Sequence, residues 1–187
     1  MKIAVFCASS NRIEPLYFEA ARELGKEMNE KAWELVYGGT NCGLMWELAK
    51  TILSKGGKVK GIIPGCIEER GVKARHLTEL VIAPDMKERK QLMRDTADAF
   101  VALPGGWGTL EEITEVITLK QLGIHRKPIV FVNTGGFYDL FFSFISQACR
   151  ENFISPAYAG LYEIVPDAKG AVDYIESYEG KEILSKY

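Results

Sequence analysis

The sequence predicts an α/β fold, in which a Rossmann-like, doubly wound parallel sheet carries helices on both faces of a single domain. Short apolar runs that end in small or glycine-rich residues alternate along the chain with stretches whose apolar residues recur at helical spacing. Such alternation is typical of βαβ units, which build parallel sheets covered by helices. A length of 187 residues, of which 47% are hydrophobic, suits one globular domain. We therefore expect residues 1–187 to form one α/β domain, with the residues after about 178 as a tail.

The expected elements alternate along the whole sequence. The opening run from Lys2 to Ala8 is apolar and ends in small polar residues, and the next stretch places Leu16, Ala20 and Leu24 at helical spacing. The same pair of patterns then recurs. We expect strands over residues 2–8, 34–37, 58–63, 80–83, 99–103, 129–132 and 162–165, and helices over residues 14–31, 44–55, 86–96, 109–122, 137–150 and 168–177.

Three loops follow predicted strands at the edge where parallel sheets bind ligands. In open α/β sheets, ligands lie beyond the carboxyl ends of the strands, at the point where the strand order reverses. The loops in this position cover residues 8–12, 38–43 and 104–108. The segment 65–75, which is charged and bounded by glycine, is expected to be a surface loop near the same site.

Composition narrows the classes of partner. The formal net charge of -2 lacks the basic excess that nonspecific binding to nucleic acid or anionic lipid requires, so we expect neither kind of partner. The four cysteines are scattered without metal-ligand spacing, which indicates reduced thiols, no metal site and a cytoplasmic protein. The first apolar run is too short for the core of a signal peptide, and no run reaches the roughly 18 apolar residues of a membrane span.

Two glycine-rich loops are candidates for binding phosphate. Residues 38–43 (GGTNCG) and 104–108 (PGGWG) each lie between a predicted strand and a predicted helix, so their amides can cradle an anion at the positive end of a helix. The first loop matches neither the dinucleotide fingerprint nor the P-loop, and a tight turn also explains its glycines. Two such loops together favour phosphate capture. Ser9 and Ser10 can donate to a phosphate or a ribose, although serines are also common in turns.

The predicted helix 86–96 directs cations inward. Met86 and Met93 lie seven residues apart and mark its apolar stripe, and Arg89 and Lys90 fall between them. Burying charge without a partner costs on the order of several kcal/mol, so an anionic ligand is the simplest partner for the pair. The alternative is that both cations snorkel at the edge of a solvent face, which consists of Lys87, Glu88, Gln91, Arg94 and Asp95.

Glu112 allows two interpretations. The stretch Thr109-Leu110-Glu111-Glu112 fits a capping box, in which an N-cap hydroxyl and the carboxylate three residues later bond to free amides. Glu112 also shares a flank of its helix with Glu115 and Leu119. Acidic groups beside apolar surface indicate a pocket or a subunit contact. The apolar stripe from which this flank is turned away consists of Leu110, Ile113, Val116 and Ile117.

These motifs together resemble the LONELY GUY family, many of whose members were once labelled lysine decarboxylases. The helix stretch MKERKQLM, residues 86–93, precedes PGGWGTLEE, residues 104–112, and the two match the family's arginine–lysine helix and its PGGxGTxxE pattern in order and spacing. The similarity extends to residues 7–10, 37–45, 56–64 and 121–133. The positions that depart from the family, and that bear on the shape of the phosphate loop and on substrate preference, are Ala8, Thr40, Trp46 and Lys87.

The resemblance implies a nucleotide-binding domain that hydrolyses the N-glycosidic bond of an adenine-type nucleoside 5′-monophosphate, either a cytokinin riboside 5′-monophosphate or AMP. The products are free base and ribose 5-phosphate. A carboxylate near the anomeric carbon supports the oxocarbenium-like transition state, so Glu112 is the catalytic candidate, with Arg89 orienting the ribose phosphate or Glu112 itself. The expected substrate-binding residues are Ser9, Ser10, Gly38, Gly39, Thr40, Met86, Lys90, Gly105, Gly106, Gly108, Thr109 and Glu115.

The resemblance also implies a homodimer with active sites near its interface, and the apolar flank at Leu119 and Leu122 independently suggests one. No metal or organic cofactor is expected, and no arrangement of lysine and acid supports a pyridoxal phosphate site. The alternative class is a noncatalytic nucleotide or molybdenum-cofactor carrier built on the same sheet. Arg89 and Glu112 favour the enzyme, whereas Arg94, on the predicted solvent face, is expected to tolerate substitution.

Overall fold

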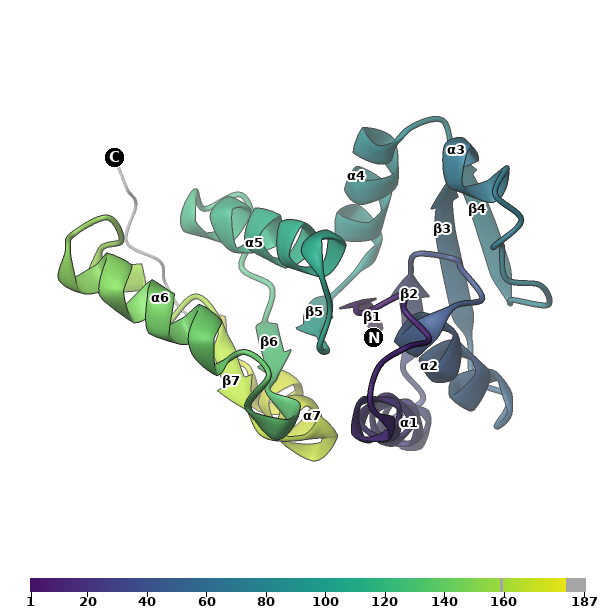
Figure 1. Cartoon of the computed structure of the whole chain (residues 1–187), viewed down its shortest axis with the longest axis horizontal. Coiled ribbons are helices and arrows are strands. Elements are labelled where there is room, and N and C mark those ends of the chain that lie inside the picture. The colour runs from purple at the N-terminus through teal and green to yellow at the C-terminus, as the bar shows by residue number, and fades with distance from the viewer. Residues whose placement is uncertain (159, 181–187) are drawn as a thin grey trace.

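The computed structural model describes residues 1–158 and 160–180, which form one seven-stranded sheet with helices around it (Figure 1). The strands are β1 Lys2–Phe6, β2 Glu34–Tyr37, β3 Val59–Pro64, β4 Glu79–Ala83, β5 Ala99–Ala102, β6 Ile129–Val132 and β7 Glu163–Val165. The α-helices are α1 Pro15–Glu30, α2 Gly43–Leu53, α3 Gly65–Glu68, α4 Met86–Thr96, α5 Trp107–Gln121, α6 Asp139–Arg150 and α7 Ala168–Ser177. The 3-10 helices are η1 Thr134–Gly136 and η2 Pro156–Tyr158.

All strand pairs are parallel, and the strand order β4-β3-β2-β1-β5-β6-β7 places β1 at the centre of the sheet. Ile3 of β1 pairs with Leu35 of β2 on one side and with Ala99 of β5 on the other. The strand order therefore reverses between β1 and β5. The loops that follow these two strands touch, because the amide of Ala8 donates to the carbonyl oxygen of Pro104 at 3.1 Å.

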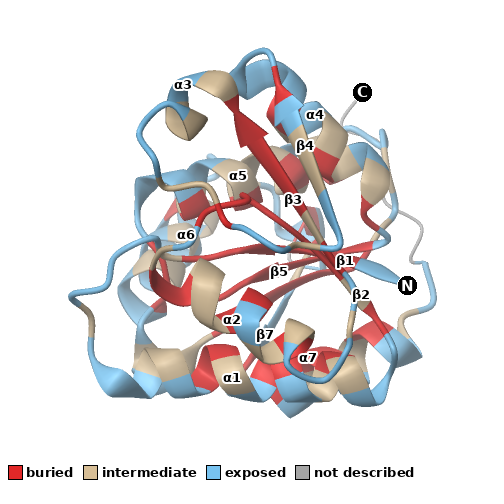
Figure 2. Ribbon diagram, turned by 90° about the vertical axis from the view of Figure 1, so that its right-hand side faces the viewer, coloured by how far each residue is buried: buried red, intermediate tan, exposed pale blue. Residues whose placement is uncertain are grey.

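Helices cover both faces of the sheet, which is the doubly wound arrangement predicted from the sequence. Ile3 and Val5 point into a core shared with α1, α2 and α7, whereas Ala4 and Phe6 point into a core shared with α4 and α5. This division follows from the alternation of side chains along a strand. Figure 2 shows the central strands buried between helices whose outer surfaces are exposed, whereas the edge strands β4 and β7 are mostly not buried.

The predicted boundaries agree with the observed elements within two residues. The bounds of β2, β6, α4 and α7 coincide with the predicted ones, and the short helices α3, η1 and η2 have no counterpart in the prediction. The difference that matters for the site is at α5, which begins at Trp107 rather than at Thr109. Most of the predicted tail, residues 181–187, lies outside the described residues.

The helix starts differ in how their free amides are satisfied. Asp85 caps α4 by accepting from the amide of Glu88 at 2.8 Å, and Asp167 caps α7 in the same way through Gly170. The N-cap of α5 is Gly106, and no side chain caps this helix, so its first amides remain available. Among the helices of the described chain, none is long and apolar enough to cross a membrane.

Candidate active site

A cavity of about 510 Å³ opens at the carboxyl ends of the central strands, where the strand order reverses. The segments after β1, β2, β3 and β5 build its wall together with the start of α4. The volume lies in the range of about 300–1,000 Å³ that is usual for small-molecule sites. The predicted site residues that line it are Ser9, Gly38, Thr40, Met86, Arg89, Gly106, Gly108, Thr109 and Glu112.

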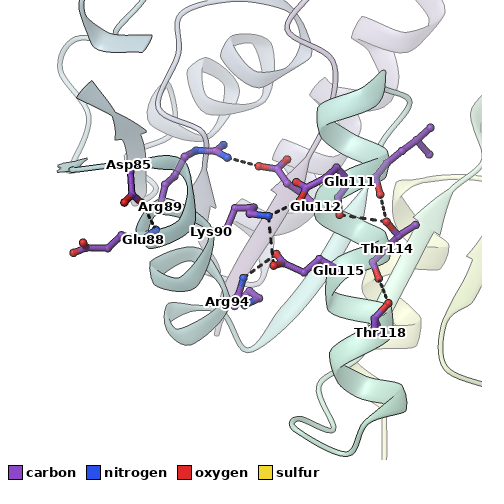
Figure 3. A network of polar contacts seen from close by, with 11 residues as sticks. Asp85, Glu88, Arg89, Lys90, Arg94, Glu111, Glu112, Thr114, Glu115 and Thr118 are labelled. Atoms are coloured by element: carbon purple, nitrogen blue, oxygen red, sulfur yellow. Dashed lines mark hydrogen bonds and ion pairs between the residues drawn. The ribbon is translucent and has the colours of Figure 1, made fainter. Parts of the chain in front are cut away.

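Arg89 reaches the cavity from α4 and is held by two acceptors. Its Nε donates to the carbonyl oxygen of Ile62 at 3.1 Å, and its Nη1 donates to the carboxylate of Glu112 on α5 (Figure 3). The side chains of Arg89 and Glu112 are only 10% and 12% exposed. Gly38 leaves room for this guanidinium, because a Cβ atom there would lie 2.7 Å from Nη2 of Arg89 and would displace it. Arg89 is thus the inward-facing cation that its helical position predicts, and its partner within the chain is an acid on the neighbouring helix.

Burial and charge act on Glu112 in opposite directions. Burial raises the pKa of its carboxyl above the ordinary value, and the guanidinium of Arg89 offsets part of that rise. Burial, with the nearby charge of Glu112, also raises the pKa of the Cys7 thiol, which lines the cavity as a neutral group. A carboxyl with a raised pKa in a cavity is typical of groups that accept and release protons.

The capping-box interpretation of Glu112 is wrong. The N-cap of α5 is Gly106, so Thr109 lies inside the first turn of the helix instead of capping it. Thr109 is buried, and its side chain fills the space beside Gly105 where a Cβ atom would otherwise lie. The Glu112 carboxylate accepts from Arg89, which is a charged partner on another helix and a stronger donor than a neutral amide.

The two glycine-rich loops differ in the amides that they offer to a ligand. In the loop 38–43, the amide of Gly43 donates to Asn11 at 2.8 Å, and that of Asn41 donates at 2.9 Å to a carbonyl of the segment after α3. At the start of α5, the first amides have no intrahelical acceptor and no side-chain cap, and residues 106–109 line the cavity. The positive end of α5 is therefore the better anion site of the two.

Lys90 and Glu115, both predicted to bind substrate, lie in an ion-pair network between α4 and α5 (Figure 3). The Nζ atom of Lys90 contacts the carboxylates of Glu111 and Glu115, the latter at 3.4 Å. Arg94 donates to Glu115 at 2.8 Å and is 22% exposed, so the prediction that Arg94 lies on the solvent face is wrong. The cavity wall contains neither Lys90 nor Glu115.

Three other predicted residues lie outside the cavity wall. Ser10 accepts from the amide of Arg12 at 3.1 Å, which is a contact within its own turn. Gly39 has a φ of 74°, in the left-handed region that favours glycine, and its carbonyl accepts from Ala74. Gly105 is buried against α5. These residues shape the backbone of the loops around the cavity.

Met86 departs from the predicted apolar stripe of α4. Met93 is buried as expected, but Met86 is 44% exposed because it stands at the first position of the helix, where the side chain faces the cavity and not the core. The cavity wall contains Met86, as predicted for a substrate-binding residue. The prediction that Met86 belongs to the buried apolar stripe of α4 is wrong. Within residues 1–158 and 160–180, no group of three or more His, Cys, Asp or Glu is placed to hold a metal ion.

The segment 65–75 lies beside the site, as predicted. An antiparallel bridge between Thr40 and Lys73 joins it to the loop after β2. The glycines and charges that bound this segment indicate a loop, but they do not show which side chains turn inward. Trp107, for which the sequence allows a place in a base pocket or at a subunit contact, also lines the cavity. The cavity-lining residues that the prediction omitted are Cys7, Ala8, Cys42, Met45, Pro64, Ile67, Arg70, Val72 and Glu111.

The fold and the cavity define a Rossmann-like α/β protein whose candidate site combines a helix N-terminus with a buried arginine–glutamate pair. Residues 45–175 match the family model described as possible lysine decarboxylase. Cytokinin riboside 5′-monophosphate phosphoribohydrolase LOG7 of Arabidopsis thaliana is 44% identical over an alignment of 187 residues, which covers 99% of this chain and 86% of that protein. The corresponding enzyme LOG of Oryza sativa subsp. japonica is 44% identical over 177 residues, 95% of this chain and 73% of that protein. The chain belongs to this family, and the predicted family resemblance is confirmed.

Solved structures confirm the fold class. The structure of the Moco carrier protein from Chlamydomonas reinhardtii has a TM-score of 0.71 and 23% identity, and covers 94% of both chains. The molybdenum cofactor binding protein of the phototrophic bacterium Rippkaea orientalis has a TM-score of 0.72 and 19% identity, covering 94% of this chain and 95% of that one. At such identities the likeness concerns the fold alone.

Proposed function

We propose that this chain is a nucleoside 5′-monophosphate phosphoribohydrolase, which uses water to break the N-glycosidic bond of an adenine-type nucleotide. The names of its relatives support this reaction. The observation that carries the proposal is the Arg89–Glu112 pair in the cavity wall, close to the uncapped start of α5. A site for an anion beside a buried carboxylate suits a substrate that joins a phosphate to a reactive sugar.

Glu112 is the proposed catalytic residue. When the bond between the anomeric carbon and the base nitrogen breaks, the base leaves with the bonding electrons and gains a proton, and positive charge develops on the sugar. An ionised carboxylate stabilises that charge and accepts a proton from the attacking water, whose oxygen becomes the new hydroxyl group of ribose 5-phosphate. Release of this proton to solvent balances the proton that the departing base takes up from solvent, and returns the carboxylate to its ionised form. Arg89 orients the carboxylate and favours its ionised form, which burial alone would disfavour.

We assign the 5′-phosphate to the start of α5. The amides of Gly106, Gly108 and their neighbours would donate to the phosphate oxygens at the positive end of the helix dipole, and Thr109 lines the same part of the cavity. Ser9 and Thr40, from the loops after β1 and β2, offer hydroxyl groups to the ribose. A nucleoside without the phosphate would lose the strongest of these contacts.

We assign the base to the apolar part of the cavity wall, which Met45, Ile67, Val72 and Met86 form. Apolar side chains suit the faces of a purine, and flexible methionines adapt to groups of different size. AMP and the N6-substituted cytokinin riboside 5′-monophosphates are therefore both proposed as substrates. The relative rates on the two would show how far the wall favours the substituent.

We also propose a homodimer in the cytoplasm. Leu140 and Phe144 of α6 lie four residues apart on one helix face and are 86% and 64% exposed, and Leu122 is exposed at the end of α5. Large exposed apolar side chains that share one helix face, as Leu140 and Phe144 do, are typical of protein interfaces. Trp107, at the edge of the cavity, is also highly exposed, which supports an active site near the interface. The four cysteines are free thiols, as a reducing compartment would keep them.

Chromatography of a nucleotide panel tests the proposed reaction. The protein would be incubated with AMP, an N6-substituted adenosine 5′-monophosphate, GMP, CMP and adenosine, and free base and ribose 5-phosphate would be quantified. We expect equimolar base and ribose 5-phosphate from the adenine-type monophosphates. Tight binding without release of base from any member would instead support the carrier alternative.

A further inference from the structure

Three cations of α4 form ion pairs with three carboxylates of α5, as can be followed in Figure 3. Lys90 and Arg94 are one helical turn apart, as are their partners Glu111 and Glu115, so the contacts follow one another along both helices. The site pair at Arg89 belongs to the same series. We call the whole series of contacts the α4–α5 ladder, and its pairs are Arg89–Glu112, Lys90–Glu111 and Arg94–Glu115.

Glu115 holds two cations of the ladder at once. Its Oε2 accepts from Arg94 at 2.8 Å, and its Oε1 lies 3.4 Å from the Nζ atom of Lys90. The side chains of Lys90, Arg94 and Glu115 are 19%, 22% and 30% exposed, so these contacts are screened less by water and salt than an ordinary surface pair. Glu115 is absent from the cavity wall, so it contacts α4 and not the interior of the cavity.

We propose that Glu115 is a positioning residue of the hydrolase, which fixes α4 against α5 through Lys90 and Arg94 and thereby keeps Arg89 on Glu112. This role rests on the function proposed above. Arg89 and Glu112 follow different strands, β4 and β5, so their contact depends on how the two helices lie relative to each other. Catalytic groups must be held within about 0.5 Å of their productive geometry, which side chains of the supporting shell provide.

The substitution Glu115→Gln removes the charge and keeps the size of the side chain. We expect kcat for base release to fall about 10-fold or more while KM stays near the wild-type value, because Glu115 acts on catalytic geometry and does not touch the substrate. Arg94→Gln should lower kcat to a similar extent. The double variant should lose little more than either single variant, since the two residues act as a unit.

A matched control removes an ion pair of similar length far from the site. Glu176 of α7 contacts Lys31 at 2.7 Å, and the side chains of Lys31 and Glu176 are 37% and 43% exposed. Glu176→Gln should leave kcat and KM unchanged. Thermal unfolding of each variant shows whether a fall in kcat comes from unfolding or from a displaced Arg89–Glu112 pair in folded protein. If Glu115→Gln does not fold, Arg94→Gln tests the same Arg94–Glu115 contact.

The pH profile of kcat separates positioning from a simple effect of charge. Besides Arg89, the charged groups that act on Glu112 are Lys90 of α4 and Glu111 of its own helix, and the neutral Cys7 thiol after β1 is itself affected by the charge of Glu112. Loosening Arg89 from Glu112 would raise the pKa of Glu112, because burial would then be offset less. Removing the negative charge of Glu115 without movement would lower it. We therefore expect the acid limb of the Glu115→Gln profile to move to higher pH.

Three results would overturn the positioning role: wild-type kcat in Glu115→Gln, a rise in KM that exceeds the fall in kcat, or an acid limb that moves to lower pH. The second would mean that Glu115 contacts the substrate. Failure of the proposed function is a different result, because wild-type protein would then release no base from any nucleotide of the panel.

Discussion

Replacing Glu112 by glutamine removes the negative charge of the cavity acid and keeps the size of the side chain. The glutamine oxygen can still accept from Arg89, but the amide can neither take a proton from water nor neutralise a cationic sugar. Electrostatic and acid–base contributions of this kind are each worth about 100-fold in rate. We therefore expect kcat to fall by about 100-fold or more, which corresponds to about 2.7 kcal/mol in the barrier.

The same substitution should leave the protein folded, because Glu112 does not cap α5 and glutamine keeps an acceptor for Arg89. Arg89 keeps its bond to the carbonyl of Ile62, and the amide oxygen of glutamine takes the place of the carboxylate oxygen as the second acceptor. Arg89 also borders the open cavity. The change in the free energy of unfolding is then about 2 kcal/mol, within the range of a hydrogen bond between charged groups. For a domain of this size, that change shifts the melting temperature by about 4–8 °C.

Base release would be followed by chromatography and folding by circular dichroism during heating. Glu88→Gln is the matched control, because Glu88 is an exposed acid of α4 outside the cavity wall. This control should keep wild-type turnover. Near-normal turnover in a folded Glu112→Gln protein would refute the catalytic role and direct attention to Glu111, whose side chain also lines the cavity.

Four further predictions concern the phosphate, the room around Arg89, pH and assembly. AMP should be hydrolysed with a kcat/KM at least about 100-fold above that of adenosine, since charge-assisted contacts to phosphate are lost with the nucleoside; equal efficiencies would disprove the phosphate site at α5. Gly38→Ala should displace the Arg89 guanidinium, whose Nη2 would lie 2.7 Å from the new Cβ atom, and should lower kcat more than it lowers the melting temperature. Because burial raises the pKa of Glu112 and the ionised form is active, activity should fall on acidification with a midpoint above the ordinary value of 4.5, as a pH profile of kcat/KM would show. Wild-type protein should sediment as the proposed dimer in analytical ultracentrifugation and Phe144→Glu, on the exposed face of α6, as a monomer; a wild-type monomer would exclude the assembly.

The sequence by itself determined the fold and the edge of the sheet at which the site lies. Hydrophobic periodicity is a local property, so it marks α4 over residues 86–96 and α7 over residues 168–177 without knowledge of the packing. Parallel strands bring all their carboxyl ends to one edge, so the loops after β1, β2 and β5 had to meet there. The position of Arg89 on the inner face of its helix followed from the same periodicity.

Only the tertiary structure decided the partners of the charged residues. The pattern at Thr109 is compatible with a cap or with a helix that begins earlier, and the backbone at Gly106 selects the earlier start. Glu112 meets Arg89 across 23 residues of sequence, and Lys90 turns to Glu111 and Glu115 instead of to the cavity. Helical spacing specifies the face of a helix on which a side chain lies. The partner of that side chain depends on which other element packs against the face, and a local sequence pattern does not specify this packing.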